Sequence, residues 1–165
     1  MKKISILFVL ILTLIQYNSF SQKNKALEFN NKISKLSTNY LDKAKEFGRK
    51  LQTSISTHNF STLQKTYNEL NKIIADDIIQ ITALKNVGGS EDMKTTMLAY
   101  LKFEQNIIAK GFRPFIKMTK STTDKEVKTA TDNLMELVKK ESDYLIEVRK
   151  VQQEYADKNG FRIAQ

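Results

Sequence analysis

Two glutamates stand at positions where a helical protein could carry chemistry, because each falls on the apolar side of a predicted helix. Glu104 follows Leu101 by three residues, and Glu141 follows Leu137 by four. Residues at these intervals share one face of a helix. A buried carboxylate is costly without a partner, so each glutamate is a candidate acid, base or cation ligand. The alternative is a structural pair with a Lys or Tyr from a neighbouring helix. We prefer it because structural pairs also perturb carboxylates.

The residues that common bundle cofactors need are missing. His58 is the single histidine, it lies in a predicted turn, and the chain contains no cysteine. A di-iron site requires Glu-x-x-His on two helices, covalent haem requires Cys-x-x-Cys-His, and a nucleophilic triad requires a base beside its nucleophile. Gly88-Gly89 is not followed by the Lys-Ser/Thr of a phosphate-binding loop. We therefore expect no catalytic residue, no cofactor and no metal site, and we predict that the protein is not an enzyme.

The elements that must position these residues are helices. Apolar side chains recur at intervals of three and four, and no segment alternates as a strand would. Short turns force neighbouring helices to run antiparallel, so the fold class is predicted as all-α, an antiparallel up-down-up-down four-helix bundle. A repeated pair of helical hairpins is the alternative, because Tyr40-Leu41 matches Tyr100-Leu101, but so few matches fit chance. The expected helices span about residues 23–56, 61–86, 90–118 and 123–160.

Helix ends are also written into the chain. Thr123 and Glu126 have the spacing of a capping box, and Gly160 before Phe161 is typical of a left-handed helix stop. Ser61 and Gln64 repeat the capping-box spacing, and Ser90 is expected to cap the third helix.

Two positions inside the predicted helices need a special explanation. Pro114 removes a backbone donor and clashes with the preceding turn. The third helix therefore either kinks near Gly111 or ends and restarts, and we prefer a kink because Met118 keeps the same phase. Gly48, beside Phe47, is expected to allow close approach of a neighbouring helix.

The start of the chain has the features of a signal peptide. Lys2 and Lys3 precede an apolar run over residues 4–15, which is shorter than the about 20 residues of a membrane-spanning helix. Cleavage is expected before Gln22, and the lack of Cys closes the lipoprotein route. We therefore predict an exported protein, periplasmic, secreted or at the cell surface, with no transmembrane segment in the mature chain. The predicted units are a signal peptide over 1–21 and one bundle domain over 22–165.

The chain is basic, with 27 Lys and Arg against 18 Asp and Glu. In the predicted bundle the C-terminal ends of the first and third helices lie together, so six basic residues could form an anion-facing surface. Lys near helix C-termini also complements the helix dipole, and we prefer this simpler explanation. Nucleic acid is disfavoured by export and by the lack of a recognition motif, which leaves anionic envelope material as the candidate partner. The six residues are Arg49, Lys50, Lys110, Arg113, Lys117 and Lys120.

Three segments carry a family resemblance. The signal peptide, Phe29-Asn30-Asn31 and the run from Val151 to Phe161 resemble a family of small exported helical-bundle surface proteins from Bacteroidota and spirochaetes. The resemblance implies a surface or periplasmic protein and transfers no catalytic residue. Some members resemble lipoproteins, and this chain departs from them because it has no Cys.

Three functions are compatible with these features. The leading hypothesis is a non-enzymatic protein of the cell envelope or surface that works by contact with another macromolecule. The first alternative is a periplasmic holdase-type chaperone, suggested by export, small size, positive charge and Phe103, which lies off the apolar stripe and is expected to be exposed. The second alternative is a sensor-like bundle that binds a small ligand, which a Tyr-lined cavity between helices would favour.

Overall fold

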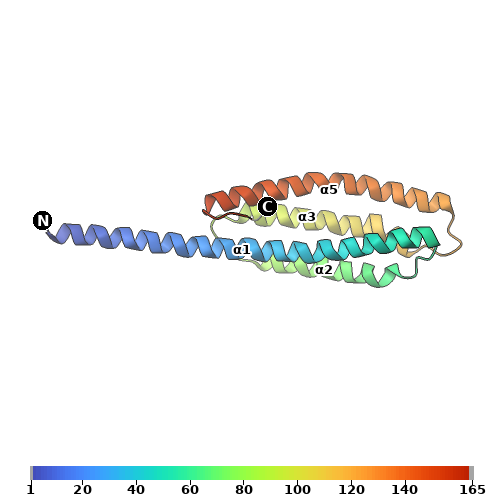
Figure 1. Cartoon of the computed structure of the whole chain (residues 1–165), viewed down its shortest axis with the longest axis horizontal. Coiled ribbons are helices and arrows are strands. Elements are labelled where there is room, and N and C mark those ends of the chain that lie inside the picture. The colour runs from blue at the N-terminus through green and yellow to red at the C-terminus, as the bar shows by residue number, and fades with distance from the viewer. Residues whose placement is uncertain (1, 164–165) are drawn as a thin grey trace.

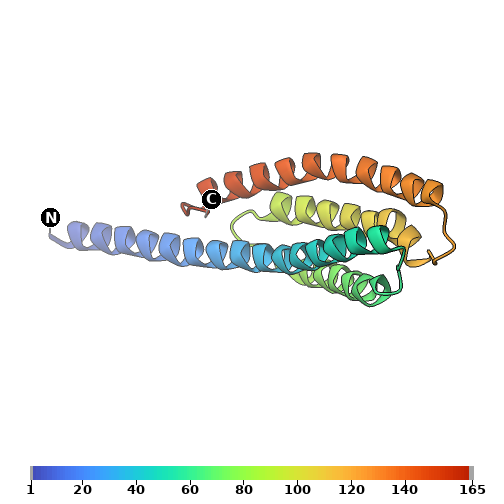
Figure 2. The same cartoon turned by 45° about the vertical axis from the view of Figure 1, so that its right-hand side comes forward.

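A computed structural model describes residues 2–163, with side chains described from Ser21 onwards. This part of the chain contains helices and no strands, and it folds as the predicted antiparallel four-helix bundle (Figure 1). The N-terminal part of α1 projects beyond the bundle (Figures 1 and 2). The helical segments are α1 (Lys2–Thr57), α2 (Leu63–Ala83), α3 (Glu91–Asn106), η1 (Ile107–Phe112), α4 (Arg113–Ile116) and α5 (Asp124–Lys158).

The predicted signal peptide spans residues 1–21. Of these residues, only Ser21 has a described side chain. The signal peptide therefore stays a prediction. No helix in the described part of the chain combines the length and the apolar character needed to cross a membrane.

The third helix crosses its proline without a break. α3, η1 and α4 follow one another directly, and η1 is π-helical. The Arg113 N–H donates to the Ile108 carbonyl, five residues earlier. Pro114 therefore begins a new α-helical turn after a wider one, which removes the clash that a proline causes inside a regular helix. Of the two alternatives for this helix, the structure excludes the interrupted one.

Gly111 within η1 provides a close helix contact. A Cβ placed there would lie 2.8 Å from Leu134 Cδ1 and 3.4 Å from Leu137 Cδ1, both on α5. The expectation that Gly48 has this role is wrong. Gly48 is exposed on α1, and a Cβ there would meet no atom within 4 Å. Phe47 beside it packs instead on Phe112, with ring centroids 4.3 Å apart.

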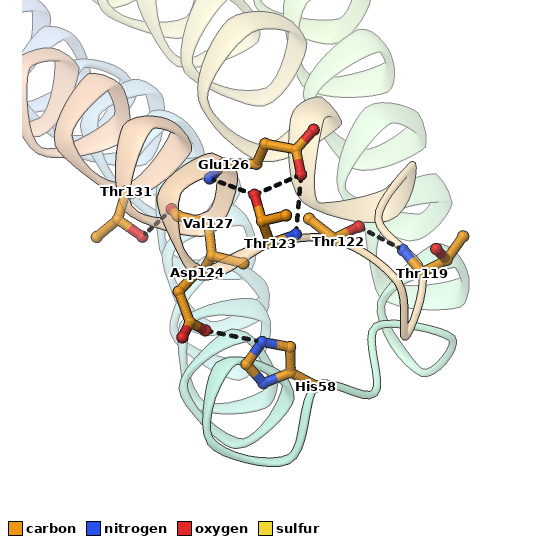
Figure 3. A network of polar contacts seen from close by, with 8 residues as sticks. All are labelled: His58, Thr119, Thr122, Thr123, Asp124, Glu126, Val127 and Thr131. Carbon is orange, nitrogen blue, oxygen red and sulfur yellow. Dashed lines mark hydrogen bonds and ion pairs between the residues drawn. The ribbon is translucent and has the colours of Figure 1, made fainter.

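The start of α5 is confirmed as a capping box. The Glu126 N–H donates to Thr123 Oγ1 over 3.3 Å, and the Thr123 N–H donates to Glu126 Oε2 over 2.8 Å. Figure 3 shows this cap beside His58 of the α1–α2 turn. His58 Nε2 lies 3.1 Å from Asp124 Oδ1, so this histidine links two helix ends across the bundle.

The end of α5 is also confirmed. Gly160 has φ +68°, and the Phe161 N–H donates to the Ala156 carbonyl over 3.1 Å, as a left-handed helix stop requires. The Tyr155 hydroxyl donates to the Val87 carbonyl over 2.9 Å, and Asn159 Nδ2 donates to the Gly88 carbonyl over 3.1 Å. These bonds tie the last turns of α5 to the α2–α3 loop.

Two predicted side-chain caps are not formed, because the side chains bond elsewhere, although Ser90 does stand at the N-cap position of α3. The Ser61 hydroxyl donates to Asn59 Oδ1 over 2.8 Å, so it does not cap α2, which begins at Leu63. Ser90 Oγ accepts from the Val87 N–H over 3.0 Å inside the preceding loop. In both cases a local side-chain bond in the turn competes with the helix cap.

Gly48 and Gly160, which are both exposed, should respond oppositely to substitution. Gly48→Ala should raise the free energy of unfolding by about 0.5–1 kcal/mol, because it removes backbone freedom where there is room for a Cβ. Gly160→Val should lower it by about 1 kcal/mol, because a Val resists the left-handed conformation. Each kcal/mol corresponds to about 2–4 °C in melting temperature for a chain of this size. Calorimetry would contradict this assignment if Gly48→Ala destabilised the protein.

Candidate functional site

Glu104 lies in the core of the bundle, as its spacing predicted. Its side chain on α3 is 2% exposed, and Tyr100, one turn earlier, is 1% exposed. The Tyr40 hydroxyl of α1 donates to Glu104 Oε2. A tyrosine from a neighbouring helix thus satisfies one oxygen of this carboxyl. This is the structural pair that was expected as the alternative to a role of Glu104 as an acid, base or cation ligand.

The Glu104 carboxyl is protonated at neutral pH. Burial raises its pKa to about 8, the Tyr40 hydrogen bond opposes the rise, and Glu141 adds to it. The pKa values of Tyr40 and Tyr100 are also raised, first by burial and then by Glu104. All three groups are therefore neutral near pH 7, and this avoids most of the cost of burying charge.

The second predicted carboxylate is less deeply placed. Glu141 on α5 is half-buried, so only Glu104 of the two lies fully in the core. Glu104 Oε1 and the Tyr100 hydroxyl have no hydrogen-bond partner among the described residues. Within the described part of the chain, no three His, Asp or Glu side chains come close enough to hold a metal ion. Because Glu104 is sealed from solvent, its arrangement fits a structural acid.

A different carboxylate lines a pocket between α1 and α2. Asp77 on α2 is 3% exposed, and its Oδ2 has no hydrogen-bond partner among the described residues. Burial, and then the neighbouring Asp76, raise the pKa of Asp77 to about 6. The carboxylate is therefore mostly ionised at pH 7 although little of it reaches solvent. The pocket has a volume of about 440 Å³ and is lined by Lys32, Lys35, Leu36, Asn39, Ile73, Asp76, Asp77 and Gln80.

The sequence does place Asp77 at an unusual position for a carboxylate. Periodicity alone, however, gives it the same pattern as a core residue. Asp77 follows Ile74 by three residues and precedes Ile81 by four, so it occupies a position of the apolar stripe of α2. This is the same pattern that singled out Glu104. The pocket itself could not be read from the chain, because its other wall belongs to α1.

The six basic residues of the predicted anion-facing surface lie on segments that meet at one end of the bundle. The C-terminal half of α1 and the run through η1 and α4 approach this end, opposite the projecting start of α1 (Figure 1). Lys50 is engaged, because its Nζ lies 2.7 Å from Glu46 Oε1 and 2.7 Å from Thr66 Oγ1. The other five are exposed and form no ion pair with a described residue.

Phe103 is not the free patch that the chaperone hypothesis requires. It is half-buried, and its ring stacks on Tyr144 of α5 with centroids 4.3 Å apart. The exposed apolar side chains lie elsewhere, chiefly on the middle of α5. The periodicity of apolar residues along α3 did not reveal this contact, because the partner ring comes from another helix.

Comparison of the chain with protein-family models, curated proteins and solved structures gives no match in any of the three. The family resemblance therefore stays a hypothesis.

Stability should fall as pH rises, because Glu104 binds its proton more tightly in the folded state. A group with a raised folded pKa stabilises fully below its unfolded value, near 4.5, and this contribution is lost as pH rises to about 8. Glu104→Gln keeps a neutral acceptor for Tyr40. We compare the free energy of unfolding of Glu104→Gln with that of wild type at each pH. The difference should favour the variant by at least about 1.4 kcal/mol more at pH 8 than at pH 5, which is the value of one pKa unit.

Glu28→Gln is the matched control, because Glu28 is exposed on α1. Urea unfolding at several pH values would measure the difference. If the free energy of unfolding changed with pH equally in the wild type and in Glu104→Gln, Glu104 would be ionised in the folded protein. Asp77 contributes with the same sign at lower pH, so Asp77→Asn should be measured beside it.

Proposed function

We propose that the protein is an exported, non-enzymatic helical bundle that binds a small zwitterionic solute, of the class of apolar α-amino acids, between α1 and α2. The observation that carries this proposal is the Asp77 carboxylate, which is 3% exposed, lines the pocket and leaves Oδ2 unpaired within the described chain. An ionised group buried without a partner is costly. A cationic group of a ligand would remove that cost.

The two walls of the pocket carry opposite charges. α1 contributes Lys32 and Lys35, and α2 contributes Asp76 and Asp77. Both lysines are exposed and, among the described residues, form no ion pair. A solute with an ammonium group on the α2 side and a carboxylate on the α1 side would satisfy both walls. A simple cation or a simple anion would satisfy one and be repelled by the other.

Apolar surface lies between the charged walls. Leu36 and Ile73 are half-buried lining residues, and Asn39 and Gln80 add amide groups. The volume of about 440 Å³ falls within the range of about 300–1,000 Å³ that is typical of small-molecule sites. The lining therefore suits an amino acid with an aliphatic side chain. The proposal corresponds to the sensor-like alternative, although no Tyr lines the pocket.

A second candidate function is contact with anionic envelope material through the basic end of the bundle. The observation that favours it is the exposure of Arg49, Lys110, Arg113, Lys117 and Lys120 without ion pairs to described residues. Such a surface would bind by charge alone. Salt would weaken this binding, because exposed charges are screened over about 10 Å at 0.1 M ionic strength.

The purified protein should bind L-leucine more tightly than it binds either single-charge analogue. 3-Methylbutylamine lacks the carboxylate and 4-methylpentanoate lacks the ammonium group, while the alkyl chain is kept. A hydrogen bond to a charged group is worth about 1.5–3 kcal/mol, so each analogue should bind about tenfold more weakly or worse. Asp77→Asn and Lys35→Gln should each weaken leucine binding by a similar factor. Isothermal titration calorimetry would measure all of these affinities.

Asp42→Asn and Lys45→Gln are the matched controls, because both residues lie on α1 outside the pocket and are largely exposed. They should leave leucine binding unchanged. No binding of any of the three compounds at millimolar concentration would reject the proposal.

Leucine affinity should also fall with acidification, because protonated Asp77 no longer attracts an ammonium group. With a pKa of about 6 for Asp77, the apparent Kd at pH 5 should be about tenfold that at pH 7. Leucine itself does not change charge in this range. Asp76→Asn should move the midpoint to lower pH, because Asp76 contributes to the raised pKa of Asp77. Affinity that is constant from pH 5 to pH 8 would exclude Asp77 as the ammonium partner.

A further inference from the structure

The middle of α5 is left bare by the rest of the bundle. None of its residues from 131 to 150 is fully buried, although buried residues occur before and after this stretch. Figure 2 shows α5 running along the edge of the molecule beside α3. Five large hydrophobic side chains are exposed there: Met135 by 53%, Val138 by 40%, Tyr144 by 37%, Leu145 by 40% and Ile146 by 64%. Apolar groups gathered on one face of a soluble protein indicate a surface that another molecule covers.

The exposed side chains have the spacing of a two-helix seam. Met135, Val138, Ser142, Leu145 and Arg149 are separated alternately by three and four residues, as in the core positions of a coiled coil. At about 100° per residue they share an arc of about 80°. Tyr144, which stacks on Phe103 of α3, lies outside this arc. The seam therefore borders the face that packs into the bundle, and the same helical phase is buried nearer the two ends of α5, at Val127 and Ala156.

We infer that a second copy of this chain covers this seam, with the two α5 helices antiparallel and Ser142 at the two-fold axis. In a two-fold interface a residue on the axis meets its own copy, and every other contact occurs twice, once from each partner. Val138 then meets the partner's Leu145, and the small Ser142 side chains allow the helices to approach at their crossing. Met135 meets the partner's Arg149, whose aliphatic stem can cover it.

The charges beside the seam select this direction. An antiparallel partner brings Asp132 opposite Lys150 and Lys139 opposite Asp143, so both pairs attract. A parallel partner would place these charges opposite the other flank of the seam, so neither pair could form. These four residues lie on the same flank of the seam by helical phase, and all are exposed. A contact of about four turns buries less than the about 1,600 Å² of a standard interface, so association should be weak and concentration-dependent.

Sedimentation equilibrium of the full protein tests the inference. The wild type should pass from monomer to dimer as concentration rises through the micromolar range. Val138→Gln and Leu145→Gln should each weaken the dimer at least tenfold. Both side chains are partly in solvent, so circular dichroism should show an intact fold. Ile79→Gln is the matched control, because Ile79 on α2 is 66% exposed and lies off the seam; it should leave dimerisation unchanged.

A single introduced thiol gives a second measurement, because the chain has no Cys. Ser142→Cys should form a disulfide-linked dimer under mild oxidation at least tenfold faster than Lys140→Cys, which lies on the opposite side of α5. A monomer at all concentrations without preferential cross-linking of Ser142→Cys would overturn the inference, as would a dimer that Val138→Gln and Leu145→Gln leave unchanged. A monomer whose binding to phosphatidylglycerol vesicles requires Val138 and Leu145 would instead assign the seam to a lipid surface.

Discussion

The structure depends on α5 being fastened at its two ends. At one end the Thr123 cap and the His58–Asp124 contact of 3.1 Å join α5 to the α1–α2 turn. At the other end Tyr155 and Asn159 donate to the carbonyls of Val87 and Gly88. α5 also meets α1 there, because Gln152 Nε2 donates to Asn30 Oδ1 over 2.8 Å. A helix held in this way can run the length of the bundle without burying its middle.

Between these ends α5 packs chiefly on the third helix. The missing side chain of Gly111 gives room to Leu134 and Leu137, and Phe103 stacks on Tyr144. The π-helical turn places Gly111 just before Pro114, so one local irregularity both accommodates the proline and admits the neighbouring helix. The face of α5 that turns away from these contacts keeps its exposed apolar stripe.

Glu104 and Asp77 both lie on the apolar stripe of a helix, but their surroundings differ. Glu104 is enclosed, accepts a hydrogen bond from Tyr40 and holds its proton, so its pKa is raised to about 8. Asp77 lines a pocket, lacks a described partner at Oδ2 and has a smaller rise in pKa, to about 6. The same sequence pattern therefore produces a neutral structural group in one place and a largely ionised group at a pocket in the other. Both side chains are almost fully enclosed, and burial is the first cause of the raised pKa at each. They differ in that Glu104 has Tyr40 as a partner, whereas Asp77 Oδ2 has none among the described residues.

Features encoded within a few residues were readable from the chain. The four helices follow from apolar intervals of three and four. Both ends of α5 follow from Thr123, Glu126 and Gly160, because a capping box and a left-handed stop are local interactions. The burial of Glu104 followed from its phase on α3. The caps expected at Ser61 and Ser90 failed because nearby turn groups, Asn59 and the Val87 N–H, bonded these side chains instead.

Tertiary structure decided everything that needed two helices at once. Gly48 and Gly111 are both glycines in helical segments, and only packing showed that α5 approaches the second and nothing approaches the first. Tyr40 became the partner of Glu104, and Lys32 and Lys35 came to share a pocket with Asp77, because α1 lies against residues far along the chain. Periodicity reports which side of a helix is apolar, but it carries no information about which neighbour covers that side. The sequence by itself therefore determined the helices and both ends of α5, while the pocket and the bare seam arose from how the helices meet.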